Sequence, residues 1–310
     1  MDTLASPSST PGASGAADSA PASAASSRRC QLLRRARANR PFMFGLALLA
    51  LIVLLALLVP LVYPHDPYAQ DLARRAVPPV WYERGSWDHV LGTDALGRDY
   101  LARLLHGGRV SLLISLSVVL ISGAIGTTLG VVAGYFSGRI DLAITFLITS
   151  FLAMPSILIA LVIVSMVGSS LTVVILVLGL LMWIRFAVVT RTATQQIRAL
   201  DYVASAQAVG ASRWTIIFGE VLPNVMPQVI VVATLEAASA VMVEAALSFL
   251  GLGVQPPTPS WGLMIAEART YMFFSFWMIA IPGIALGLLA LAINLVGDGL
   301  RDLFAAGSRN

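Results

Sequence analysis

The chain has 310 residues, of which 57% are hydrophobic and only 12% are charged. This composition excludes a soluble enzyme with one large core and predicts an all-α membrane protein with several transmembrane helices. The formal net charge is +4, and all 20 basic residues are Arg, so the chain lacks the Lys of a Walker A phosphate loop. These Arg residues flank apolar runs, which indicates membrane topology and not nucleic-acid binding.

The N-terminal part predicts a disordered, Arg-rich cytoplasmic tail over residues 1–40. Residues 1–27 are mostly Ser, Ala and Pro, too poor in large apolar groups to fold alone. Six Arg between Arg28 and Arg40 favour a cytoplasmic location. Cys30 is the only cysteine, which excludes an intrachain disulfide. Phe42–Val62 is long enough to cross a bilayer and lacks a small-residue cleavage site, so we expect an uncleaved first span.

Residues 64–108 form the largest polar segment and are expected to be an outer loop. Thr93 or Asp94 is predicted to begin a helix that lies along the membrane surface. Its apolar side would contain Leu96, Tyr100, Leu104 and Leu105.

Charged and imidazole groups in this loop indicate no catalytic or metal site. His89 and His106 have no Cys or His partner at the sequence spacing of a metal site. Asp94, Arg98 and Asp99 are interpreted as a local set of ion pairs and not as catalytic carboxylates.

Three further spans follow. The second is predicted over Ser111–Gly134, the third over Leu142–Met166 with a kink at Pro155, and the fourth over Leu171–Val189. Arg185, near the end of the fourth, is expected to extend to the membrane interface. Small residues on one side of the second span predict close packing against another helix. They are Gly123, Gly126, Gly130 and Gly134.

The coupling loop, residues 190–225, is the longest polar interruption in the second half of the chain. Asp201 is predicted to cap a helix over Val203–Val209, and Gly210 to end it. Ser212 would cap a second helix, Arg213–Val221, that Leu222 and Pro223 end. A short helix of small residues can enter a groove on a partner, although an ordinary cytoplasmic loop is the alternative interpretation.

The fifth span is predicted over Pro227–Leu247 and contains two carboxylates at membrane depth. Such groups normally face a bundle interior or water. Glu236 is the deeper one and is the candidate for the translocation pathway. Glu244 is nearer the outer end, where a structural hydrogen bond and a substrate contact are both open. An outer segment, residues 248–275, precedes the sixth span, Phe276–Val296.

Six spans place both termini in the cytoplasm, with a membrane domain over residues 41–300 and a tail over 301–310. Twelve Arg then lie on the inner side and seven on the outer side. Most of the outer Arg lie in one long loop, where charge is a weaker topological signal.

Several strings resemble the C-type permease subunit of dipeptide, oligopeptide and nickel ATP-binding-cassette (ABC) importers. They are LGTDALGRD from Leu91, Pro155-Ser156, SFLGLGVQPPTPSWG from Ser248, and GDGLRD ending at Asp302. The resemblance implies a type I ABC importer permease fold in a bacterial inner membrane. It also implies four partners besides the lipid bilayer: a homologous permease, two ATPase subunits and an extracytoplasmic binding protein. ATP and Mg would be bound by the ATPases, so this chain itself would hold no cofactor.

The same resemblance makes Tyr202–Ala211 a coupling helix that docks on an ATPase. The family motif has Glu-Ala-Ala, then Gly, then Leu-Pro. This chain departs from it at Ala204, which replaces the Glu, and at Ser205, which replaces the first Ala, so it lacks the carboxylate that could make a charge contact there. The residues implicated in coupling are Asp201, Tyr202, Ala204, Ser205, Ala206, Gly210, Leu222 and Pro223.

Alternative functions for this chain differ in the cargo, in the chemistry or in the energy source. The same architecture could import oligopeptides, nickel or glutathione instead of dipeptides. A membrane-embedded enzyme would need a cluster of nucleophile, base or metal ligands within the membrane, which the chain does not offer. A proton-coupled secondary transporter could use Glu236, but such proteins usually show an internal repeat that is not evident here.

Overall fold

The computed structural model describes residues 37–307, so the expectations for Cys30 and for residues 1–36 of the N-terminal tail lie outside the described residues. The described part is helical, with two isolated β-bridges in the outer loop. Its helices are α2 (Arg40–Val62), α3 (Tyr100–Phe136), α4 (Gly138–Leu152), α5 (Ser156–Val167), α6 (Leu171–Leu181), α7 (Trp183–Arg198), α8 (Asp201–Ala208), α9 (Arg213–Ile216), α10 (Leu222–Phe249), α11 (Trp261–Ala268) and α12 (Trp277–Gly307).

Among the described residues, five helical segments are long and apolar enough to cross a membrane, and one of them, Leu171–Arg198, consists of α6 followed by α7. A sixth crossing is provided if α4 and α5 act together, and these two are bent by 82° at the break between them. The third span is therefore a broken pair and not one kinked helix. Pro155 is the N-cap of α5, and a residue before proline is disfavoured in the helical conformation, so the chain leaves the helix at this point.

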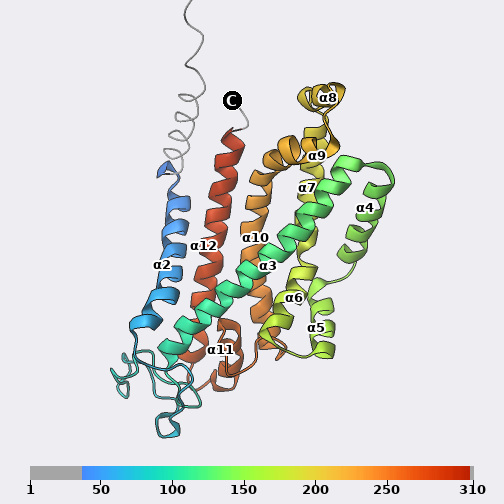
Figure 1. Ribbon diagram of the computed structural model, residues 1–310. Helices are drawn as coiled ribbons and strands as arrows, with labels where there is room; N and C mark the ends of the chain where they lie inside the picture. Colours follow the sequence, from blue (N-terminus) through green and yellow to red (C-terminus); the bar gives the residue numbers. More distant parts are fainter. Residues whose placement is uncertain (1–36, 308–310) are drawn as a thin grey trace, which may run out of the picture.

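Both described ends of the chain lie at the same end of the helix bundle. The beginning of α2, the end of α12 and the short helix α8 share that end, whereas the outer loop and α11 lie at the opposite end (Figure 1). This arrangement agrees with an even number of crossings.

Helix α3 corrects the expectation of a separate surface helix in the outer loop. It begins at Tyr100, where the carboxylate of Asp99 accepts a hydrogen bond from the amide of Ala102 at 2.7 Å, and it continues for 37 residues. Leu96 lies before this cap, so it cannot share a helix face with Tyr100. The preceding turn contains Gly92 and Gly97, both with a positive φ that favours glycine.

The glycine-lined face of α3 packs directly against α7, as the glycine spacing predicts. A Cβ atom added at Gly126 would lie 2.2 Å from the carbonyl oxygen of Trp183, and one at Gly134 would lie 2.6 Å from that of Arg191. The prediction of close packing on this face is therefore confirmed. The contact fixes α7, which carries Arg185, relative to the rest of the bundle.

The predicted end of the second coupling-loop helix is wrong. Helix α9 passes through a π-helical turn, Ile217–Val221, and joins α10, which begins at Leu222. Pro223 lies in the first turn of α10, where a missing amide hydrogen and a fixed φ fit a helix start. The fifth span and the end of the coupling loop are therefore one continuous element. At the same end of the bundle, α12 extends to Gly307, well beyond the predicted Val296.

Candidate functional site: a membrane cavity and a coupling helix

A cavity of about 480 Å³ lies within the helix bundle. Residues of α4, α5, α6, α7, α10 and α12 line it. Its wall is mostly apolar and includes three methionines, Met154, Met182 and Met242. The volume lies in the range of pockets that hold small molecules.

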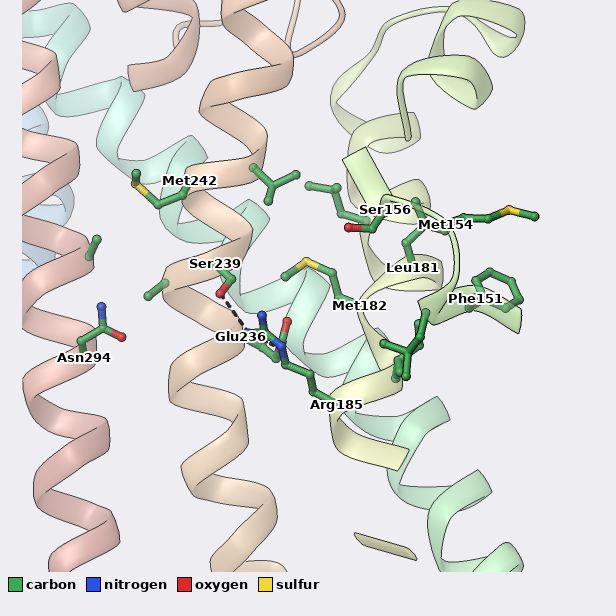
Figure 2. A pocket seen from close by; sticks show the side chains of 16 residues that line it. Phe151, Met154, Ser156, Leu181, Met182, Arg185, Glu236, Ser239, Met242 and Asn294 are labelled. Carbon is green, nitrogen blue, oxygen red and sulfur yellow. Dashed lines mark hydrogen bonds and ion pairs between the residues drawn. The ribbon is translucent and has the colours of Figure 1, made fainter. Parts of the chain in front are cut away.

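Two opposite charges meet in this cavity (Figure 2). Nη1 of Arg185 on α7 lies 3.0 Å from Oε1 of Glu236 on α10, and it also donates to the hydroxyl of Ser239 at 3.4 Å. The Glu236 side chain is only 2% exposed, whereas that of Arg185 is 65% exposed. The carboxylate is thus neutralised from the cavity side by a guanidinium that remains accessible.

Arg185 is a residue that sequence reasoning assigned to the wrong environment. It was expected to extend to the interface, but its guanidinium points into the cavity toward Glu236 (Figure 2). The signal that could have identified it is the presence of both acidic and basic side chains in the predicted spans, since such groups usually pair. Glu236 itself lines the cavity, in the position that its depth suggested.

Glu244 lies elsewhere, at the junction of α10 with the outer segment. Its side chain is fully buried, and its Oε1 accepts hydrogen bonds from Ser248 at 2.8 Å and Ser260 at 3.0 Å. Ser260 also caps α11 by accepting from the amide of Leu263. Of the two interpretations of Glu244, the geometry favours the structural one, because these bonds fix the outer segment on α10.

A buried ionic cluster joins the outer loop to the outer segment. Asp94 accepts from Nε of Arg98 at 2.6 Å and from Arg103, and both arginines contact Glu267 on α11. The ion pair expected between Asp94 and Arg98 is present, but Asp99 does not belong to it. The cluster instead includes Arg103, nine residues after Asp94, and Glu267, which lies 169 residues after Arg98 in the sequence and so could not be paired with it from spacing.

Asp99 belongs to a second cluster, beside the end of α2. Its Oδ2 accepts from Nδ1 of His89 at 2.8 Å and from the hydroxyl of Tyr63 at 3.1 Å. Burial, and then the charge of Asp99, raise the pKa of Tyr63 above its usual value, so the phenol remains a donor. Although His89 has no Cys or His partner at metal-site spacing in the sequence, the fold brings ligand atoms of His65, His89 and Asp99 within 4.8 Å of one another. Tyr63, His89 and the amide of Ala102 all donate to Asp99. These bonds tie the outer loop to the end of α2 and to the start of α3.

At the opposite end of the bundle, α8 is a single short helix closed by a Schellman motif. The amide of Gly210 donates to the carbonyl of Gln207, and that of Ala211 to the carbonyl of Ala206, each at 3.0 Å. Gly210 has φ of 88°, so the predicted helix stop is confirmed. The start is corrected: Asp201 lies inside the first turn, and Leu200 is the N-cap without a side-chain bond.

One side of α8 anchors the helix and the remainder is exposed. Val203 is fully buried and packs with Ile216 and Val225, whereas Ala204 and Ser205 are exposed. Exposed apolar side chains continue along the segment: Tyr202, Val209, Trp214 and Phe218. The eight residues predicted for coupling are therefore divided, since Asp201 to Gly210 belong to α8 and its cap, and Leu222 and Pro223 belong to α10.

Comparison with protein families decides the class of this chain. Residues 126–310 match the model of the binding-protein-dependent transport system inner membrane component, and residues 30–79 match the N-terminal transmembrane domain of oligopeptide transport permease C. The chain belongs to this permease family. It is an inner-membrane subunit of an ABC importer and not an enzyme, and it works with a separate ATPase and a binding protein.

Relatives of the permease extend over most of its length. It is 44% identical over 264 residues to the di/tripeptide transport system permease protein DppC of Pseudomonas aeruginosa, which covers 85% of this chain and 87% of that protein. It is 38% identical over 264 residues to the dipeptide transport system permease protein DppC of Haemophilus influenzae, with coverage of 85% and 90%.

A solved structure shares the fold of the permease. An inward-facing structure of the MetNI methionine ABC transporter contains a chain that matches with a TM-score of 0.55 at 18% identity, covering 65% of this chain and 95% of that chain. At this identity the likeness concerns the fold alone. It supports the predicted type I permease architecture.

Proposed function

We propose that this permease imports dipeptides and other short peptides, together with a homologous permease subunit and two ATPase subunits that bind ATP and Mg. An extracytoplasmic binding protein delivers the peptide to the outer end of the bundle. ATP-driven closure of the ATPases then shifts the permease pair between inward- and outward-open states, a two-state change biased by a ligand.

The single observation that carries the coupling part of this proposal is the placement of α8. The helix lies at the bundle end shared by both described chain ends (Figure 1). Its buried side holds it on the bundle through Val203, while Val209 is 89% exposed beside the exposed Ala204 and Ser205. Small side chains permit a close approach, and exposed apolar groups gain free energy when a partner covers them. A docking groove on an ATPase supplies such a partner.

The cargo part is supported by the names of the relatives and by the cavity. Both relatives compared above are named for peptide transport. The exposed charge in the cavity is the guanidinium of Arg185, which repels a metal cation and attracts a carboxylate. This favours peptides over nickel. Glutathione is itself a small peptide with carboxylates, so only direct uptake separates it from dipeptides.

The experiment is purification of the native complex through a tag on this chain, followed by reconstitution into liposomes. We expect two ATPase subunits and a second permease to co-purify, and we expect ATP-dependent uptake of a labelled dipeptide when the binding protein is present. A complex that takes up nickel and no peptide would overturn the cargo. A chain that transports peptide without any ATPase, driven by a proton gradient, would overturn the coupling.

A further inference from the structure

We propose that Arg185 is the cargo-binding residue of the cavity, that it binds a carboxylate of the transported peptide, and that Glu236 is a positioning residue that holds it. This inference rests on the proposed peptide import and adds which chemical group of the cargo the membrane part recognises. It goes beyond the family assignment, which specifies no residue that contacts cargo.

The first argument is the hydrogen-bonding capacity that Arg185 retains. A guanidinium carries five N–H donors in a planar fork that matches a carboxylate. Among the described residues, the polar contacts of Arg185 involve Nη1 alone, with Glu236 and Ser239. Nε and Nη2 are left to bind a ligand, and the side chain is 65% exposed. The pair can therefore accept a second carboxylate without breaking the first contact.

The second argument concerns the different exposure of the two partners. Glu236 is almost completely buried, so it has little surface to offer to a cargo molecule. Its carboxylate instead attracts the Arg185 side chain toward α10 and keeps the guanidinium in the cavity. A long side chain held in this way loses less rotamer freedom when cargo binds, which favours binding.

The third argument is the remaining wall of the cavity. Met154, Met182 and Met242 are flexible, polarisable side chains that adapt to varied apolar groups. Asn294 and Ser156 add polar atoms without charge. One fixed site for a carboxylate and an adaptable wall suit a class of ligands that share a carboxylate and differ in side chains. Short peptides are such a class.

The test compares variants of the reconstituted complex at saturating peptide-loaded binding protein, and measures peptide uptake and ATP hydrolysis together. The Arg185→Gln variant leaves Glu236 without its counter-charge and can fail to assemble for that reason. The decisive variant is therefore Arg185→Gln/Glu236→Gln, which removes both charges and keeps two hydrogen-bonding side chains. Arg139→Gln is the matched control, because Arg139 is exposed at the start of α4 and does not line the cavity.

We expect the double variant to assemble and to retain stimulated ATP hydrolysis within about twofold, while peptide moved per ATP falls by about tenfold or more, the effect of losing a hydrogen bond to a charged group. Arg139→Gln should equal the wild type. Unchanged peptide uptake per ATP in the double variant would overturn the inference, and so would an equal loss of hydrolysis and uptake, which indicates a structural role. Wild-type complex that moves no peptide would instead overturn the proposed function.

Discussion

Gly126 of α3 and Trp183 of α7 meet backbone to backbone, since a Cβ atom at the glycine would lie 2.2 Å from the tryptophan carbonyl oxygen. Real Cβ atoms do not approach oxygen so closely, so any side chain here separates the two helices. Because Arg185 follows Trp183 by two residues, this crossing also determines where the cavity charge lies.

We therefore expect Gly126→Ala to destabilise the permease, although alanine is favoured over glycine within helices by about 1 kcal/mol. Overpacking of a close contact costs about 1–3 kcal/mol, and a backbone atom cannot rotate away as a side chain can. Gly123→Ala is the matched control on the same helix face, because its Cβ atom would lie 3.5 Å from the nearest atom of the Phe186 ring, an ordinary van der Waals distance. The unfolding temperature of the purified complex, measured for both variants, tests this expectation. Equal stability of the two variants would contradict this packing.

Arg103 offers a prediction about the outer end of the bundle. It is 1% exposed and contacts both Asp94 and Glu267, so it holds two carboxylates between the outer loop and α11. Arg103→Met removes the shared cation and leaves buried negative charge, at a cost of about 3–5 kcal/mol. Arg74→Met is the control, because Arg74 pairs with Asp71 on the surface, where such pairs contribute about 0–1 kcal/mol. A similar fall in unfolding temperature for both variants would argue against a buried network.

Much of this fold could be predicted from the sequence, because apolar runs in a membrane protein must become helices. The first span differs from the structure by two residues at its start, and the glycine face of α3 was assigned correctly. The limits of α3 could not be predicted in the same way. Asp94 and Asp99 are equally good capping residues in the sequence. In the structure Asp94 closes a turn by accepting from the amides of Leu96 and Arg98, and Asp99 caps α3.

The candidate site was also predictable only in part. Glu236 was identified because a carboxylate at membrane depth is conspicuous, but its partner was not, since Arg185 lies 51 residues earlier on another helix. Pro223 was interpreted as a stop because proline usually ends helices. The π-helical turn before it continues the chain into α10, and no local sequence pattern predicts that turn.

The transmembrane orientation can be tested by cysteine labelling in a Cys30→Ser background. Thr93 is fully buried, so a cysteine there would not report accessibility, whereas Trp87 in the same loop is 81% exposed. We expect Trp87→Cys to react with an impermeant reagent in intact cells, because the outer loop faces the cell exterior. Arg139→Cys, exposed at the other end of the bundle, should react only after permeabilisation. The reverse pattern would invert the topology and exclude α8 from contact with a cytoplasmic ATPase.

Gly210 provides the sharpest test of coupling. Its φ of 88° suits glycine, and within residues 37–307 no atom beyond its two chain neighbours lies within 4 Å of an added Cβ, so a side chain here meets no obstacle in the described part of the permease. Asn and Asp have the same shape, and both tolerate this backbone region better than other residues. Gly210→Asn therefore measures the backbone cost, about 1 kcal/mol or less, and Gly210→Asp adds only a charge.

If α8 docks in an ATPase groove, the charge of Gly210→Asp enters a desolvated contact and weakens it strongly, because an unpaired buried charge is costly. We expect this variant to insert and to pair with its sister permease, since nothing in the fold opposes it, but to lose the ATPase subunits or the transport-linked hydrolysis. Gly210→Asn should retain most of both. Membrane level, ATPase co-purification and peptide uptake are measured side by side on the three proteins. Normal uptake with Gly210→Asp would show that α8 is an ordinary loop element, and a matching loss with Gly210→Asn would assign the effect to the helix stop and not to docking.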